Sequence, residues 1–158
     1  MVYDREQAIA YAHQWAFGRN PRYADFSGMG GDCTNFISQC LFAGGAKMDS
    51  ARTFGWYYYS LSNRAPAWTS VQALYQFLVH RKGPGPSARE ILLEEILPGD
   101  IIQLSFDGTR YAHSLLVVAT GRRPAEDHVL IATHTQDSDY RPLSTYAFSK
   151  YRCLKING

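Results

Sequence analysis

The sequence lacks the features that mark several classes of protein. Three cysteines are too few for a disulfide-stapled scaffold. The 16 Lys and Arg nearly balance the 14 Asp and Glu, and without a basic stripe, nucleic acid and anionic membranes are not favoured partners. No apolar run approaches the ~20 residues of a membrane-spanning helix. Residues 1–6 carry no signal-peptide pattern, so we expect either a cytoplasmic protein or the mature part of an exported one.

Metal-binding motifs are missing as well. The chain contains no Cys-x-x-Cys pair and no His-Glu-x-x-His segment, which are common zinc-binding patterns. A metal site built from Cys33, His113 and His134 is a third-ranked interpretation, because these side chains are soft or borderline ligands. We expect no metal and no cofactor.

What the chain does have is the composition of an ordinary globular protein. Its 158 residues are the usual length of one domain, and 46% of them are hydrophobic. At this length, folding buries roughly two-thirds of the surface of the unfolded chain, which is enough for a core without covalent staples. We therefore expect a single domain over residues 1–158.

Helical patterns occupy the first part of the chain and strand patterns the last part. Asp4 with Gln7 is typical of the start of a helix, and Gly44 of the end of another. The apolar spacing predicts helices at about 5–17, 33–43 and 70–80, with a short helical stretch at 89–96. Period-two patterns predict strands at 101–106, 111–119, 129–132 and 151–156. This order of elements indicates an α+β fold with a small antiparallel sheet.

Cys33 is the most informative residue, because a glycine loop leads directly into the helix that it begins. At a helix N-terminus, a thiol faces unpaired main-chain N–H groups and the positive end of the helix dipole, both of which stabilise a thiolate. A nucleophile is one interpretation. The other is that Cys33 is the first member of a buried stripe with Phe36 and Cys40, since free cysteine is mostly buried. Cys40 and Cys153 lie in apolar patterns and are expected in the core.

A nucleophilic cysteine needs a base, and His113 is the best candidate among the five histidines. It opens the apolar part of one predicted strand, and His134 follows the end of the next. If those strands pair antiparallel, both imidazoles lie at the same end of the sheet, and His134 could hold the second ring nitrogen of His113 in the correct tautomer. The alternative is that either histidine is an ordinary residue at a strand end.

The block Gly-Gly-Asp-Cys-Thr-Asn-Phe-Ile-Ser-Gln-Cys-Leu, at residues 30–41, carries a family resemblance. It resembles the signature of the bacterial family described as the putative amidase domain, in the papain-like clan with NlpC-type cell-wall peptidases and CHAP domains. The resemblance covers nearly the whole chain. It also includes Tyr-Asp-Arg-Glu-Gln-Ala from residue 3, Asn-Pro-Arg-Tyr from residue 20, Trp-Tyr-Tyr from residue 56, Pro-Gly-Asp-Ile-Ile from residue 98, and Ala-His-Ser from residue 112.

The resemblance implies a papain-like fold in which Cys33 is the nucleophile and His113 the base. The third polar residue of the clan lies on the next strand, which indicates His134 here and leaves Asp137 and Asp127 as alternatives. A tyrosine upstream of the cysteine serves near the oxyanion in NlpC-type relatives. This suggests Tyr23, with the main chain of Asp32 as another possible donor.

The same resemblance implies a cysteine-dependent amidase or peptidase that cleaves amides of bacterial cell-wall peptidoglycan, and therefore a protein exported to the cell surface. The aromatic run that begins at Trp56 could line the substrate groove, although such a cluster is more often part of a core. The alternative function is a non-catalytic module that uses the aromatic run to bind a cell-wall peptide or glycan.

Overall fold

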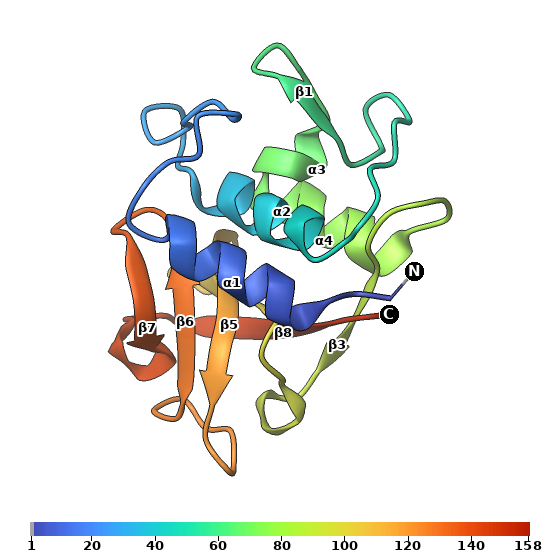
Figure 1. Ribbon diagram of the computed structural model, residues 1–158. Helices are drawn as coiled ribbons and strands as arrows, with labels where there is room; N and C mark the ends of the chain where they lie inside the picture. The colour runs from blue at the N-terminus through green and yellow to red at the C-terminus, as the bar shows by residue number, and fades with distance from the viewer. Residues whose placement is uncertain (1) are drawn as a thin grey trace.

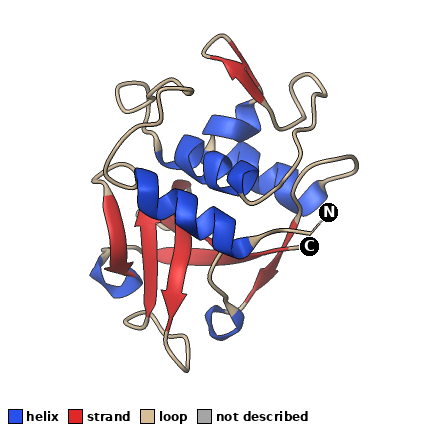
Figure 2. Cartoon of the chain, viewed as in Figure 1, coloured by secondary structure: helices blue, strands red, loops and turns tan. Residues whose placement is uncertain are grey.

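The computed structural model describes residues 2–158 as a layer of helices on one face of an antiparallel sheet (Figures 1 and 2). The helices are α1 (Arg5–Trp15), α2 (Cys33–Ala43), α3 (Pro66–Thr69) and α4 (Val71–His80). The sheet contains β3 (Ala88–Ile91), β4 (Ile101–Ser105), β5 (Tyr111–Thr120), β6 (Val129–Thr133), β7 (Ser138–Pro142) and β8 (Lys150–Ile156). Its strand order is β3-β8-β4-β5-β6-β7, and every neighbouring pair is antiparallel.

Smaller elements complete the chain. The strands β1 (Tyr58–Ser60) and β2 (Asn63–Arg64) form a hairpin that projects beyond the helices (Figure 1). Single turns of 3-10 helix lie at Leu93–Glu95 and Leu143–Thr145. No helix within residues 2–158 combines the length and apolar character that crossing a membrane requires.

The central strands are buried on both faces, and the alternation of side chains along β5 shows how. Leu116 and Val118 pack under the helices with Leu154, whereas Leu115 and Val117 pack on the opposite face. Successive side chains of a strand point to opposite faces, so one strand supplies two clusters. The second cluster is covered by the 3-10 turn that contains Leu143 and by the segments around it.

Helix starts and stops follow local sequence rules. The Asp4 carboxylate accepts a hydrogen bond from the Gln7 N–H at the start of α1, and the Ser70 hydroxyl accepts one from the Ala73 N–H at the start of α4. Gly44 caps α2 at a point where a Cβ would lie 2.6 Å from the Tyr3 ring. Only glycine therefore fits between the end of α2 and the beginning of the chain.

The structure confirms the predicted mixed α+β class with its antiparallel sheet, and corrects several elements. Residues 88–91 form β3 rather than part of a helix, because they pair with the last strand along 153–156. The short helix α3 and the edge strand β7 were not predicted. Neither has a periodic apolar pattern long enough to identify it.

Candidate active site

A chain of buried hydrogen bonds joins the N-terminus of α2 to the middle of the sheet. The hydroxyls of Thr34 in α2 and Ser114 in β5 lie 3.0 Å apart, and the Gln103 amide of β4 donates to the Ser114 hydroxyl at 3.2 Å. Cys33 immediately precedes Thr34, and His113 immediately precedes Ser114. The docking of α2 onto β5 therefore brings the Cys33 thiol within hydrogen-bonding reach of the Ser114 main chain, directly after His113 in the strand.

Cys33 is the first residue of α2, and only 6% of its surface is exposed. Burial raises the pKa of the Cys33 thiol above its usual value. Hydrogen bonds from the main chain of Ser114 and from Thr34 oppose that rise. The expectation of a thiolate at rest is thus not met, because the loss of solvent outweighs the groups that stabilise the anion.

His113 is 5% exposed, and burial together with the positive charge of Arg141 lowers its pKa to about 4. Its ring centroid lies 6.4 Å from that of Phe106 and 5.7 Å from that of Tyr146. At neutral pH the imidazole is therefore uncharged and able to accept a proton.

His134 does not contact His113 in the way that was expected. Its Nε2 donates to the carbonyl oxygen of Trp15 at 2.8 Å, and its Nδ1 lies 2.5 Å from the Asp32 carboxylate. The ring also stacks on Phe36 with a centroid distance of 4.1 Å. Both nitrogens are occupied, so His134 joins the end of α1 to the start of α2 instead of orienting the base.

Asp32 uses its carboxylate to organise the loop before the nucleophile. Oδ1 accepts hydrogen bonds from the Phe26 N–H at 2.8 Å and from the Asn35 amide at 2.9 Å, and Oδ2 faces His134. The side chain does not cap α2, although Asp32 occupies the N-cap position. The first N–H groups of α2 are therefore not capped by that carboxylate and stay available to a developing negative charge.

Other residues singled out from the sequence lie elsewhere. The ring of Tyr23 packs on Tyr58 and Trp68, with centroid distances of 5.1 Å and 6.0 Å. Trp56 is fully buried, and its indole N–H donates to the Ser38 hydroxyl at 3.1 Å. Trp56 therefore belongs to the core of the helix layer and does not line a groove. Of the run that begins at Trp56, only Tyr59 is substantially exposed.

The two alternative acids are also away from the base. Asp137 makes a double hydrogen bond with the Arg19 guanidinium, at 2.9 Å and 3.1 Å, and the side chain of Asp127 is 70% exposed. The structure shows neither of them as a partner of His113.

Tyr146 and Arg141 belong to this site but escaped sequence analysis. The Tyr146 hydroxyl is buried without a hydrogen-bond partner among the described residues. Burial raises the pKa of its phenol, and the positive charge of Arg141 opposes that rise without cancelling it. The Arg141 guanidinium lies 3.7 Å from the Tyr146 ring centroid. Both residues lie between the predicted strands at 129–132 and 151–156. That stretch has no regular apolar period, so no sequence signal identifies them.

A shallow pocket of about 470 Å³ lies beside the start of α2. Its lining residues come from the glycine loop at 28–31, from the turn at 135–137 and from Arg19. Gly31 has φ of 111°, and a Cβ there would lie 3.3 Å from the Thr135 hydroxyl oxygen. Glycine at this position keeps the pocket open and satisfies the backbone conformation.

Two remaining observations concern the other thiols and metal ligands. Cys40 and Cys153 are free and buried, one in each hydrophobic cluster, as predicted. Within residues 2–158 there is no group of three or more His, Cys, Asp or Glu side chains arranged to hold a metal ion.

Comparison with known proteins gives one family and one relative. A family model described as "Putative amidase domain" matches residues 2–156. A curated relative, the uncharacterized protein YhbB of Bacillus subtilis (strain 168), is 38% identical over 144 residues, which cover 88% of this chain and 43% of the relative. The chain thus spans less than half the length of that relative. No solved structure matches the chain.

Proposed function

Because the chain belongs to the putative amidase domain family, we propose that it hydrolyses amide bonds with Cys33 as the nucleophile and His113 as the base. The observation that carries this proposal is the hydrogen bond from the Ser114 main chain to the Cys33 thiol, because Ser114 directly follows His113 in β5. A binding module would need neither the thiol nor the neutral imidazole at this point.

The reaction begins from a neutral pair. His113 takes the proton of the Cys33 thiol as the sulfur attacks the carbonyl carbon, and the imidazolium then gives this proton to the leaving amine. A water molecule, deprotonated by His113, attacks the thioester and releases the acid with the free thiol. A low pKa at His113 makes its imidazolium a strong acid, which assists departure of the amine.

The uncapped N-terminus of α2 supplies the N–H of Cys33 to the oxyanion of the tetrahedral intermediate. The second donor in this proposal is the hydroxyl of Tyr146. Its phenol is protonated, buried and unpartnered, and its ring lies against His113. Tyr23, which the resemblance suggested for this role, packs into the aromatic cluster of α3 instead.

We further propose a papain-like fold and a peptide amide of bacterial cell-wall peptidoglycan as the substrate, with the protein exported to the cell surface. The pocket lined by Gly28, Gly30 and Gly31, which precede Cys33 in the chain, supports a peptide substrate, because glycines let another main chain approach closely. The turn at 135–137 forms the opposite wall of that pocket.

The test is the release of amino groups from isolated peptidoglycan by the wild type and by Cys33→Ala. The variant should lose at least about a thousandfold in rate, because no other nucleophile is in place, while its melting temperature changes little. Equal release by both proteins would refute the assignment. A large loss of stability in Cys33→Ala would favour the buried-stripe interpretation of Cys33.

A second measurement follows the thiols themselves by site-resolved alkylation with iodoacetamide. In the folded protein Cys33 should react faster than Cys40 and Cys153, which are 0% and 2% exposed, and His113→Ala should slow Cys33 alone. If Cys33 reacts only after unfolding, it is a core thiol and the enzymatic proposal fails.

The alternative, a non-catalytic module for cell-wall peptides or glycans, is favoured by one observation: Cys33 and His113 are only 6% and 5% exposed, which leaves little of either side chain open to a substrate. A pull-down on cell walls separates the two functions. Equal binding by the wild type and Cys33→Ala, with no fragment released by either, would support the module.

A further inference from the structure

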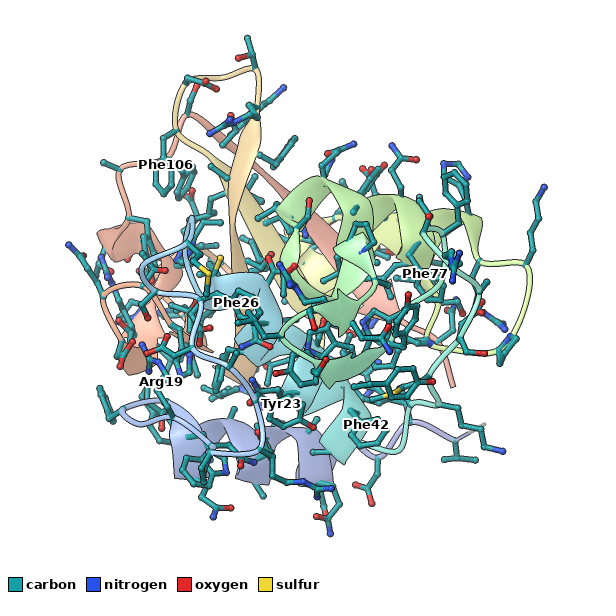
Figure 3. All side chains as sticks on the ribbon, turned by 90° about the horizontal axis from the view of Figure 1, so that it is seen from above. Arg19, Tyr23, Phe26, Phe42, Phe77 and Phe106 are labelled. Carbon is teal, nitrogen blue, oxygen red and sulfur yellow. The ribbon has the colours of Figure 1, made fainter. Side chains whose placement is uncertain are left out.

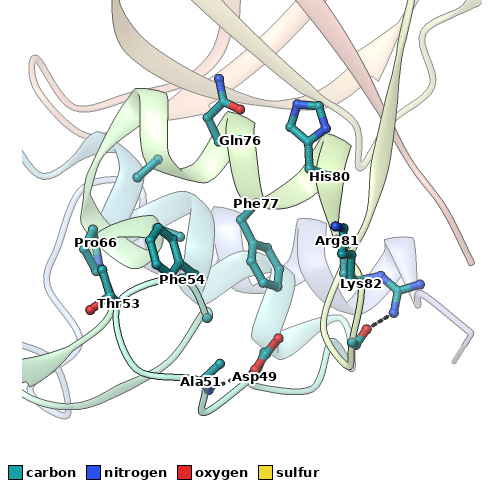
Figure 4. Close-up of a pocket in the computed structure, with 14 residues that line it drawn as sticks. Asp49, Ala51, Thr53, Phe54, Pro66, Gln76, Phe77, His80, Arg81 and Lys82 are labelled. Carbon is teal, nitrogen blue, oxygen red and sulfur yellow. Dashed lines mark hydrogen bonds between the residues drawn. The ribbon is translucent and has the colours of Figure 1, made fainter.

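Another pocket lies away from Cys33 and His113. It measures about 670 Å³ and is formed by α4, the start of α3 and the loop at 49–55 (Figure 4). Neither of the proposed catalytic residues lines it. In the view from above, Phe77 of this pocket and Arg19 of the glycine-lined pocket lie toward opposite sides of the molecule (Figure 3).

We call this pocket the α4 pocket. Its interior is apolar, and main-chain hydrogen bonds hold the loop that forms one of its walls. Phe54 and Phe77 contribute rings to the same hollow (Figure 4), and Phe54 is 86% exposed. The loop that carries Phe54 is closed by two hydrogen bonds of 2.8 Å between the main chains of Asp49 and Trp56. A Cβ on Gly55 would lie 2.2 Å from the Asp49 carbonyl oxygen, so the loop holds its shape only with glycine there.

Basic side chains outnumber acidic ones at the edge of the α4 pocket. His80, Arg81 and Lys82 stand together at one end (Figure 4), and the one acidic residue among the described lining residues is Asp49. Arg81 and Lys82 are exposed, and neither forms an ion pair within residues 2–158. Arg81 also lines an adjoining polar pocket of about 300 Å³ that contains Lys47. Arg81 donates to the Gly83 carbonyl, but neither it nor Lys82 has a carboxylate partner among the described residues, and both border a hollow that contains two aromatic rings.

We propose that the α4 pocket is a binding site for a small anionic amphiphile, an aromatic or aliphatic body that carries a carboxylate. The body fills the hollow between Phe54 and Phe77, and the carboxylate meets Arg81 and Lys82. The volume is that of ordinary small-molecule sites, which are mostly apolar with a few polar groups that orient the ligand. Bidentate contact with a guanidinium is the strongest way for a protein to hold a carboxylate. This site is independent of the proposed hydrolysis.

The experiment uses three probes with one body and different heads: 2-naphthylacetate, 2-naphthylethanol and 2-naphthylethylammonium. Each is titrated into the ¹⁵N-labelled protein at low salt while amide shifts are followed. We expect 2-naphthylacetate to bind about tenfold more tightly than the alcohol, because it meets two unpaired cations, and the ammonium to bind most weakly. The shifts should concentrate on 49–55 and 76–83.

Variants separate the two parts of the site. The double change Arg81→Gln with Lys82→Gln should lower the affinity for 2-naphthylacetate to that for 2-naphthylethanol. Phe54→Ala should lower the affinity for all three probes by the same factor. Arg122→Gln with Arg123→Gln, an exposed basic pair in another turn, and Phe17→Ala, an exposed ring outside the pocket, are the matched controls and should change nothing. Cys33→Ala should bind like the wild type.

Three outcomes would overturn the proposal. Equal affinity for the three heads would show that the cations do not recognise an anion. Shifts centred on Cys33 and His113 would place the ligand in the proposed active site. Shifts in the α4 pocket that grow with protein concentration in the absence of probe would show that a second copy of the chain fills it.

Discussion

At the scale of single residues, the site contains two buried groups that ionise in opposite senses and are both neutral at pH 7. Burial holds the pKa of Cys33 above its usual value and that of His113 at about 4. A thiolate–imidazolium pair therefore forms only as the proton moves between them. The positive charge of Arg141 contributes to this state, because it disfavours a second cation at His113.

The low pKa of His113 predicts a specific loss of stability in acid. The unfolded chain binds a proton at His113 near pH 6.5 and the folded protein only near pH 4. Stability is therefore unaffected by this group above pH 6.5 and falls as the pH is lowered from 6.5 to 4, by about 3 kcal/mol in all. Urea unfolding of His113→Gln across this range should show a correspondingly flatter decline than the wild type.

The matched control is His128→Gln, whose side chain is 60% exposed. That variant should keep the slope of the wild type. Parallel curves for His113→Gln and the wild type would mean that His113 is solvated in the folded protein and that its pKa is not lowered.

Tyr146→Phe tests the proposed second oxyanion donor. The change removes the hydroxyl and keeps the ring that lies between Arg141 and His113. We expect kcat to fall about a hundredfold, as for loss of one oxyanion donor. Stability should be equal or slightly higher, since the hydroxyl is buried without a partner.

The control for that change is Tyr140→Phe, a neighbouring tyrosine that is 56% exposed and bonded through its hydroxyl to His13. It should leave kcat unchanged. If Tyr146→Phe keeps full activity while Cys33→Ala has none, the oxyanion is held by other donors. That outcome would refute the role of Tyr146 and leave the role of Cys33 in place.

Sequence reasoning at this scale finds residues whose chemistry depends on their own element. Cys33 follows a glycine loop at the start of a helix, so its position could be read locally. His134 could not be assigned in this way, because its partners are Asp32 and the carbonyl of Trp15, which lie 102 and 119 positions away in the chain. Tyr146 is recognisable only from what surrounds it in the fold.

At the scale of elements, Asp32 is the point where three segments meet. Its carboxylate bonds to the loop at Phe26 and to α2 at Asn35, and His134 links it to the last turn of α1. Nε2 of His134 donates to a carbonyl and Nδ1 lies 2.5 Å from the Asp32 carboxylate, so both nitrogens of the ring have partners. The start of α2, and with it Cys33, is held in position from both sides.

Removing that carboxylate should therefore lower the free energy of unfolding by a large amount. Asp32→Ala leaves His134 without its partner in a site where both side chains are at most 2% exposed, and we expect a loss of about 3 to 5 kcal/mol in the free energy of unfolding. Asp25→Ala is the control in the same loop, since its side chain is 48% exposed and a surface ion pair contributes at most about 1 kcal/mol. Equal losses in the two variants would contradict the role given to Asp32.

Element prediction succeeds where local patterns and tertiary pairing agree. Asp4 and Ser70 cap their helices through their own side chains, so the starts of α1 and α4 follow from a few neighbouring residues. Residues 88–91 are different, because β3 is defined by its pairing with β8 from the far end of the chain. A long-range partner of this kind overrides the local preference.

At the scale of the whole molecule, the ends of the chain are tied to the sheet at Asp100. This buried carboxylate accepts from the Arg5 guanidinium at 2.8 Å and from the Ile156 N–H at 3.0 Å. Figure 1 shows the two ends of the chain side by side. The first helix, the start of β4 and the end of β8 are thus held by one side chain, which favours unfolding as a unit.

The thiols of Cys40 and Cys153 offer a direct test of that cooperativity, and of the prediction that residues 1–158 are one domain. Cys40 lies in the cluster beneath the helices and Cys153 in the cluster on the opposite face of the sheet. Because the strands between them contribute side chains to both clusters, neither core can be lost alone. In a urea series with brief alkylation, Cys40 and Cys153 should become reactive at the same midpoint and with the same slope.

Asp100→Ala should move both midpoints down together, since it leaves Arg5 without its buried partner. Separate midpoints would mean that the helix layer detaches from the sheet as an independent unit.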